Sequence, residues 1–69
     1  MSKNKATIGE NIRKYRQQKE MSQDRLSKLA DVAFHTIVKI ESGETPNPTI
    51  ETVRKIAHAL GVSIDDLMQ

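Results

Sequence analysis

"SQDRLSKLADVAFHTIVKIESG" (Ser22–Gly43) carries the most informative helix signals of this chain. Ser22 is a good N-cap, and the apolar residues that follow it at helical spacing predict a helix over residues 23–30. These apolar residues are Leu26, Leu29 and Ala30. Asp31 comes next, where a left-handed residue can end the helix. A second helix is expected over residues 34–42, with Gly43 as its stop signal. The stretch therefore predicts two short helices joined by a tight turn.

Helix signals continue on both sides of this stretch. Upstream, Thr7 and Glu10 fit a capping box, and the apolar spacing behind them predicts a helix over residues 8–19. Downstream, the loop "GETPNP" cannot continue a helix, so the next helix begins after Thr49 and ends at Gly61. Another capping pattern, at Ser63 to Asp66, starts a short last helix. The apolar positions of these three helices are Ile8, Ile12 and Tyr15; Ile50, Val53, Ile56, Ala57 and Leu60; and Ile64 and Leu67. Five short helices predict an all-α fold, a compact five-helix bundle.

Length and composition exclude several classes of protein. The 69 residues make a single small domain, and the absence of cysteine excludes disulfides and cysteine-based zinc sites. The sequence has no Gly-rich phosphate loop and no metal-ligand spacing, so we expect no enzyme activity, no metal and no cofactor. It also has no apolar run near the roughly 18 residues of a membrane span and no signal peptide. A cytoplasmic location is therefore the default expectation.

The charge is unevenly distributed along the chain. Residues 1–39 contain nine Lys/Arg and four Asp/Glu, for a net charge of +5, whereas residues 40–69 contain two and five, for a net charge of −3. A solvated surface of mixed charge is one interpretation, because charged faces are the norm on small domains. The other is that the first half of the chain meets an anionic partner.

The predicted helix 34–42 has two different faces. At 100° per residue, Ile37 and Ile40 lie together on the side expected to face the core, and Phe34 lies on the border. The residues that point away are His35, Val38, Lys39 and Ser42. In one interpretation Phe34 belongs to the core rim and Val38 is an ordinary exposed apolar residue. In the other, this face touches base edges in a DNA major groove, where thymine offers a methyl group and guanine two acceptors.

Two stretches of the sequence resemble a known protein family. "SQDRLSKLADVAFHTIVKIESG" and "NPTIETVRKIAHALGVSIDDLM" are similar to the helix-turn-helix and the two following helices of the Cro/C1-type (XRE-like) DNA-binding proteins. The resemblance runs from residue 8 to residue 68. It implies a lambda-repressor-like DNA-binding domain over residues 7–69. Residues 1–6, with Lys3 and Lys5, are expected to form a flexible basic N-terminus.

The resemblance also implies structural roles for particular residues. Ser27 stands where a small residue lets the two helices of the motif cross closely, and Arg16 and Glu41 match a partly buried salt bridge. Two positions depart from the family pattern. Asp31 occupies the turn position that is usually Gly, and Ala33 occupies the N-cap position that is usually Ser or Thr. The missing cap should cost on the order of 1 kcal/mol.

The function that the resemblance implies is sequence-specific binding of double-stranded DNA by a small transcriptional repressor. The helix 34–42 would lie in the major groove, and a homodimer would bind a two-fold operator. Base contacts would come from Phe34, His35, Val38 and Lys39. Phosphate contacts would come from Gln23, Ser42, Asn47, Thr49, Arg13 and Lys14. Dimer contacts would come from Val62, Ile64, Leu67 and Met68, some of which must also close the monomer core.

The contacts can be assigned chemical roles. Lys39 would donate to O6 and N7 of guanine, His35 would donate to a purine or to phosphate, and Phe34 would pack on thymine methyl groups. No small-molecule ligand and no membrane is expected as a partner.

A second function stays open at the level of sequence. The same fold could be a protein-interaction or antitoxin-like module, because Phe34 and Val38 would also suit an apolar interface. Lys39 and the basic first half favour nucleic acid. The chain is expected to be either a minimal regulator or the DNA-binding part of a longer one. The operator sequence, the choice between repression and activation, and the biological setting are not encoded in any readable motif.

Overall fold

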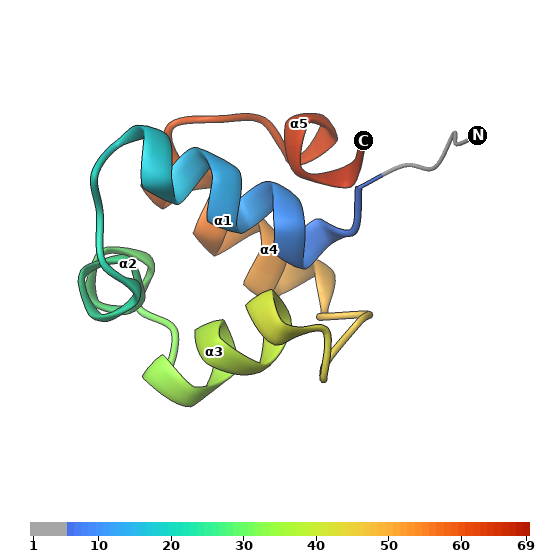
Figure 1. Cartoon of the computed structure of the whole chain (residues 1–69), viewed down its shortest axis with the longest axis horizontal. Helices are drawn as coiled ribbons and strands as arrows, with labels where there is room; N and C mark the ends of the chain where they lie inside the picture. The colour runs from blue at the N-terminus through green and yellow to red at the C-terminus, as the bar shows by residue number, and fades with distance from the viewer. Residues whose placement is uncertain (1–5) are drawn as a thin grey trace.

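The helices of this chain are short and follow one another with brief connections (Figure 1). The computed structural model describes residues 6–69, and within that range it contains helices and no strand. The helices are α1 (Ile8–Gln18), α2 (Gln23–Ala30), α3 (Phe34–Ser42), α4 (Ile50–Leu60) and α5 (Ile64–Met68). None of these helices has the length and apolar character that crossing a membrane would require. The predicted five-helix, all-α fold is confirmed, and only the end of α1, expected at residue 19, differs by one residue.

Side-chain caps start four of the five helices, as the sequence predicts. The Thr7 hydroxyl accepts from the Glu10 amide at 3.1 Å, and the Glu10 carboxylate accepts from the Thr7 amide at 3.0 Å. The hydroxyls of Ser22, Thr49 and Ser63 accept from the third amide of their own helices. The helix α3 is the exception, because Ala33 at its N-cap makes no side-chain hydrogen bond. Local polar residues therefore fix where the other helices begin.

The turn between α2 and α3 is built around Asp31. Its backbone is left-handed, with φ 57° and ψ 46°, a conformation that few non-glycine residues adopt and that Asp tolerates better than most. The amide of Val32 then donates to the carbonyl of Ser27 at 3.0 Å and closes the end of α2. The helix-turn-helix therefore forms with Asp in place of the usual glycine.

The core lies where α1, α2, α3 and α4 meet, and α5 closes it. Its fully buried side chains are Ile12, Leu26, Ile37, Ile40, Ile56, Leu60 and Leu67. Ser27 is also buried, which agrees with the expectation of a small residue at the α2–α3 crossing. Leu29 and Ile50, two of the apolar positions that indicate the helices, are exposed rather than buried. Both lie at the edge of their helix's apolar stripe, and Ile50 is also in the first turn of α4.

The helix α1 is held in place by a glycine, Gly9, and a buried polar residue, Asn11. The hydrophobic pattern of the sequence reveals neither. At Gly9, a Cβ atom would overlap the carbonyl oxygen of Ile40, so glycine is what lets α1 approach the backbone of α3. The buried Asn11 side-chain amide donates to the carbonyls of Leu67 and Gln69, both at 2.8 Å. The helix α1 therefore contacts α3 with its first turn and holds the end of α5 with its second.

Candidate nucleic-acid interface

The orientation of α3 is fixed by an ion pair to α1. The Arg16 Nε donates to one Glu41 carboxylate oxygen at 2.7 Å, and Nη2 donates to the other at 3.0 Å. The side chains are 12% and 5% exposed. Arg16 Nη1 also donates to the Met21 carbonyl at 2.7 Å, and the side-chain amide of Gln23 donates to the Glu41 carboxylate at 3.1 Å. The predicted salt bridge is present, and it connects α1, the start of α2 and α3 in one network.

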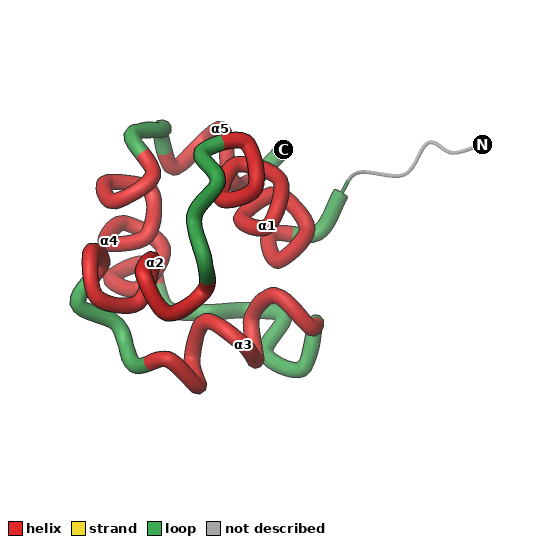
Figure 2. The backbone as a smooth tube through the Cα atoms, turned by 60° about the vertical axis from the view of Figure 1, so that its left-hand side comes forward, coloured by secondary structure: helices red, strands yellow, loops and turns green. Residues whose placement is uncertain are grey.

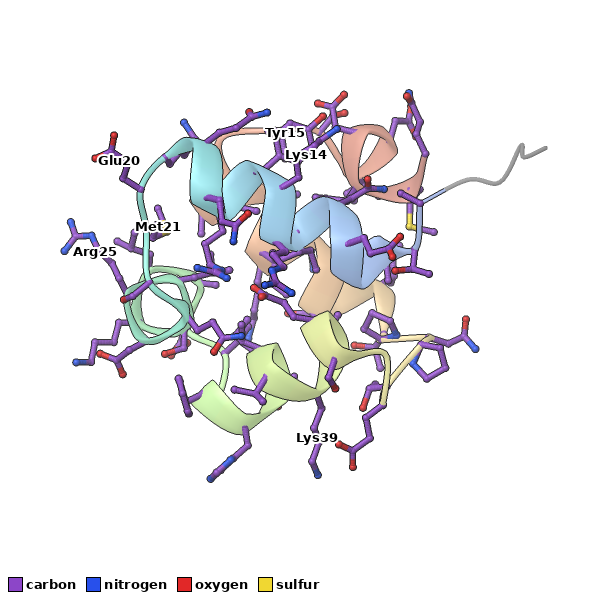
Figure 3. All side chains as sticks on the ribbon, in the orientation of Figure 1. Lys14, Tyr15, Glu20, Met21, Arg25 and Lys39 are labelled. Carbon is purple, nitrogen blue, oxygen red and sulfur yellow. The ribbon has the colours of Figure 1, made fainter. Side chains whose placement is uncertain are left out.

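The opposite side of α3 is open to solvent. Figures 1 and 2 both place α3 along one edge of the molecule, with the other helices on a single side of it. Ile37 and Ile40 are buried on the inner side, whereas His35 and Lys39 are exposed. In Figure 3 Lys39 projects from α3 away from the rest of the chain. Among the described residues no side-chain hydrogen bond or ion pair engages its ammonium group, so Lys39 can donate to a partner.

An aromatic ring begins this open face. Phe34, the first residue of α3, is 43% exposed. Its ring meets the His35 ring edge-on, with 6.0 Å between centroids and 63° between the planes. Polar hydrogen-bonding groups and an apolar ring thus lie together at the N-terminal end of one helix face.

A hollow beside Val38 joins this face to α1 and α2. Val38 is half-buried in the wall of the hollow, near the beginning of α2. The other lining residues are Arg13, Arg16, Gln23, Glu41 and Ser42. Arg16 and Glu41 are occupied with each other, so the exposed Arg13 is the cation available at this rim. The arrangement offers positive charge beside the first turn of α2, where helix amides favour an anion.

Local hydrogen bonds occupy several of the predicted phosphate contacts. The side-chain amide of Gln23 donates to Glu41, the Ser42 hydroxyl donates to the Lys39 carbonyl at 3.0 Å, and the Thr49 hydroxyl caps α4. The Ser42 backbone amide lies in the last turn of α3, so the free backbone amides at the starts of α2 and α4 are the better anion donors. Asn47 is exposed in the loop before α4.

Lys14 lies on a different side of the molecule from α3. Its ammonium group is 4.8 Å from the centre of the Tyr15 ring, and Figure 3 shows both at the edge opposite Lys39, beside α5. The amide and hydroxyl of Ser63 lower the pKa of Asp66, and the charge of Lys14 lowers that pKa further, which again places Lys14 near α5. Lys14 lines a hollow on α1 together with Arg13, and the structure does not bring it together with the predicted DNA contacts on α3.

The predicted dimer residues divide into core and surface. Leu67 is fully buried and closes the core of the single chain, so its side chain is not available to a second copy. Val62 and Ile64 are half-buried and pack against the same core. Met68, 55% exposed, is the one of the four that presents a large free apolar surface.

Two further expectations concern metal ions and the start of the chain. Within residues 6–69 no group of three or more His, Asp or Glu side chains is placed to hold a metal ion. Lys3 and Lys5, and with them most of the predicted N-terminal segment 1–6, lie outside the described residues. The exposed residues of α3 and the rim of the hollow form the candidate interface.

Comparison with known proteins adds a family and several relatives. A family model described as helix-turn-helix matches residues 12–67. The HTH-type transcriptional regulator SinR of Bacillus subtilis is 34% identical over 61 residues, which are 88% of this chain and 55% of SinR. The chain thus spans about half the length of the curated relatives that it matches.

Two solved structures are similar to this chain in both fold and sequence. The crystal structure of SinR, the master regulator for biofilm formation, in complex with DNA has a TM-score of 0.86 and 34% identity, covering 88% of this chain and 97% of that one. The P22 c2 repressor protein, solved with a synthetic operator, has a TM-score of 0.84 and 31% identity, covering 94% and 97%. Both of those proteins were crystallised on DNA.

Proposed function

Because this chain belongs to the Cro/C1-type helix-turn-helix family, we propose that it binds specific sequences in double-stranded DNA and acts as a transcriptional repressor. The open face of α3 is the observation that carries this proposal. Lys39 and His35 are exposed there beside Phe34, while the other side of α3 is fixed by packing and by a buried ion pair. Donors and apolar atoms on one rigid helix face suit the base edges of a major groove.

The proposed contacts follow from where the residues lie. The helix α3 enters the major groove, and Phe34, His35, Val38 and Lys39 meet base edges. The first-turn amides of α2, with Arg13 beside them, bind the adjacent phosphates. Asn47 and the backbone of the loop before α4 form a second phosphate contact. Lys14 is left out of this interface because it lies beside α5.

A second copy of the chain completes the proposed complex. A single α3 reaches only a few base pairs, so a two-fold dimer would bind two half-sites about 34 Å apart. Met68, with the half-buried Val62 and Ile64, supplies the apolar contact around α5. Because Leu67 is committed to the core, this contact is small, and we expect the dimer to form mainly on the operator.

We propose that the protein acts in the cytoplasm and binds DNA without catalysing a reaction. The main alternative, a protein-interaction or antitoxin-like module, would use the same α3 face. SinR and the P22 c2 repressor, at 34% and 31% identity, were crystallised with DNA, and this favours nucleic acid as the partner.

The direct test is selection of duplexes from a randomised DNA pool, followed by titration of the selected duplex against a scrambled one. At about 0.15 M salt we expect a preference of about a thousandfold or more and a pair of half-sites one helical turn apart. Lys39→Gln should weaken binding of the selected duplex about tenfold or more. Lys14→Gln removes the same charge from the far side and should change affinity little. If no sequence is enriched and binding does not fall with added salt, the proposal is wrong.

A further inference from the structure

The side chain of Asn11 is a buried polar group that takes no part in the candidate interface. It lies on α1 and is 4% exposed. Its amide nitrogen donates to the backbone oxygens of Leu67 and Gln69, both at 2.8 Å. Both partners are acceptors and the amide nitrogen has two hydrogens, so the donors of this side chain are fully used. Asn11 therefore holds the end of α5 at two points.

The helix α5 is too short to hold its own position. It has five residues, and an isolated helix of that length is not stable in water. Ser63 and Asp66 cap its beginning through side-chain hydrogen bonds, whereas the carbonyls of its last turn have no partners inside the helix. Asn11 supplies partners at that end, and the fully buried Leu67 anchors the helix in the core.

The two hydrogen bonds of Asn11 lie on either side of Met68 in the chain. Met68 is 55% exposed and is the large apolar side chain that α5 presents to solvent. The residues before and after it are bound to the same amide group, so its backbone cannot turn without breaking one of these hydrogen bonds. A buried polar group that loses its partner costs free energy, which opposes such a movement. Asn11 therefore fixes the direction in which Met68 points.

The same helix also carries α3. Two residues before Asn11, Gly9 lets the backbone of α3 come close, and five residues after it Arg16 binds Glu41. In Figure 1 α1 runs between α5 on one side and α3 on the other. The position of Met68 relative to α3 is therefore set through α1.

On the basis of the proposed function, we propose that Asn11 is a positioning residue for the pairing of two copies on the operator. Its amide holds Met68 against the second copy at a fixed distance from α3, and this fixes the half-site spacing that the pair accepts. Because Asn11 is 4% exposed, it touches neither the DNA nor the second copy and acts through α5. Its removal should leave each half-site contact intact and abolish the advantage of two adjacent half-sites.

The test compares the selected operator with a duplex in which one half-site is scrambled. The measured quantity is the cooperativity, defined as the gain in affinity of one half-site when the other is filled. In Asn11→Ala we expect the cooperativity to fall about tenfold, because about half a methionine side chain on each copy is no longer buried, and half-site affinity to stay within about twofold. Met68→Ala should lose the same cooperativity. Gln17→Ala removes an exposed amide from the same helix and, as the matched control, should keep it.

Half-site spacing gives a readout that a general loss of stability would not change. One base pair inserted between the half-sites moves them about 3.4 Å further apart and rotates them by about 35°. The wild type should lose most of its cooperativity on this longer operator. Asn11→Ala should bind the two operators equally, because its Met68 is no longer held at one distance from α3.

Hydrogen exchange measured without DNA tests the structural step separately. In Asn11→Ala the amides of α5 should exchange about tenfold or more faster than in the wild type, because two hydrogen bonds are lost, while the amides of α1 and α4 stay protected. In Met68→Ala the exchange of α5 should stay as in the wild type, since the hydrogen bonds to Asn11 remain.

The outcomes separate this inference from the proposed function. If α5 exchanges faster in Asn11→Ala but cooperativity and spacing preference stay as in the wild type, the inference is wrong and the repressor proposal stands. If Asn11→Ala loses half-site affinity as much as operator affinity, the amide supports the whole domain, and the inference is also wrong. If no operator can be selected at all, the proposed function fails and the inference fails with it.

Discussion

The two sides of α3 differ in what surrounds them. The inner side is buried by Ile37 and Ile40 and joined to α1 by Glu41, whereas the outer side presents Lys39 and Phe34 to solvent. The inner side therefore determines where the helix points, and the outer side determines what it can touch. Because different residues of one nine-residue helix carry these two roles, substitutions should separate stability from binding.

Removing Glu41 should have the largest effect on stability. Glu41→Ala leaves the Arg16 guanidinium nearly buried without its carboxylate partner, and we expect unfolding to become easier by about 3 kcal/mol. Urea denaturation followed by circular dichroism measures this change. The matched control is Glu51→Ala, which breaks an Arg–Glu pair of similar length (2.6 Å) whose glutamate is 60% exposed. That variant should change stability by less than about 0.5 kcal/mol. Equal losses in the two variants would mean that burial is not what makes the inner pair matter.

The close approach of α1 to α3 gives the next largest effect. In Gly9→Ala the new methyl group would collide with the Ile40 carbonyl, so the helices must separate. We expect a loss of about 2 kcal/mol, or a fall in Tm of about 8–16 °C for a domain of this size. Gln17→Ala, an exposed change later in α1, should leave Tm nearly unchanged. An unchanged Tm in Gly9→Ala would show that α3 can shift without cost.

A smaller change should stabilise the junction between α2 and α3. Ala33 has the extended backbone of an N-cap, with φ −57° and ψ 142°, but no side-chain acceptor. The Thr36 amide already donates to the Ala33 carbonyl at 3.0 Å. Ala33→Ser would offer it a side-chain oxygen in addition, and we expect a gain of about 0.5 kcal/mol in thermal or urea unfolding, at the low end for a cap. Ala33→Val, which also lacks an acceptor, serves as the comparison. A gain from valine as large as that from serine would assign the effect to something other than capping.

The smallest effect on stability should come from the outer side. Lys39→Gln removes no ion pair among the described residues, so its unfolding free energy should stay within about 0.5 kcal/mol of wild type. Its affinity for a selected operator should nevertheless fall about tenfold or more. A variant that loses stability and affinity together would contradict the separation of the two sides of α3.

Much of the fold could be predicted because the deciding signals are local. Both helices of the motif begin and end at the predicted residues, since Ser22 and Gly43 act on amides and carbonyls a few residues away. The ion pair of Arg16 with Glu41 required the family resemblance, because nothing local connects residues 25 positions apart. The base-contacting roles of Phe34, His35, Val38 and Lys39 stay predictions until DNA is bound.

Local signals in the chain account for the five helices, their caps, the left-handed turn at Asp31 and the residues on the outer face of α3. These follow from hydrogen bonds and spacing within one helix. The packing of the helices, by contrast, places Leu67 in the core, leaves Leu29 and Ile50 exposed, and sets Lys14 beside α5. It also revealed Gly9 and Asn11 as contacts between helices. Those outcomes depend on which surfaces meet when the helices pack, and a residue's neighbours in the sequence carry no record of that.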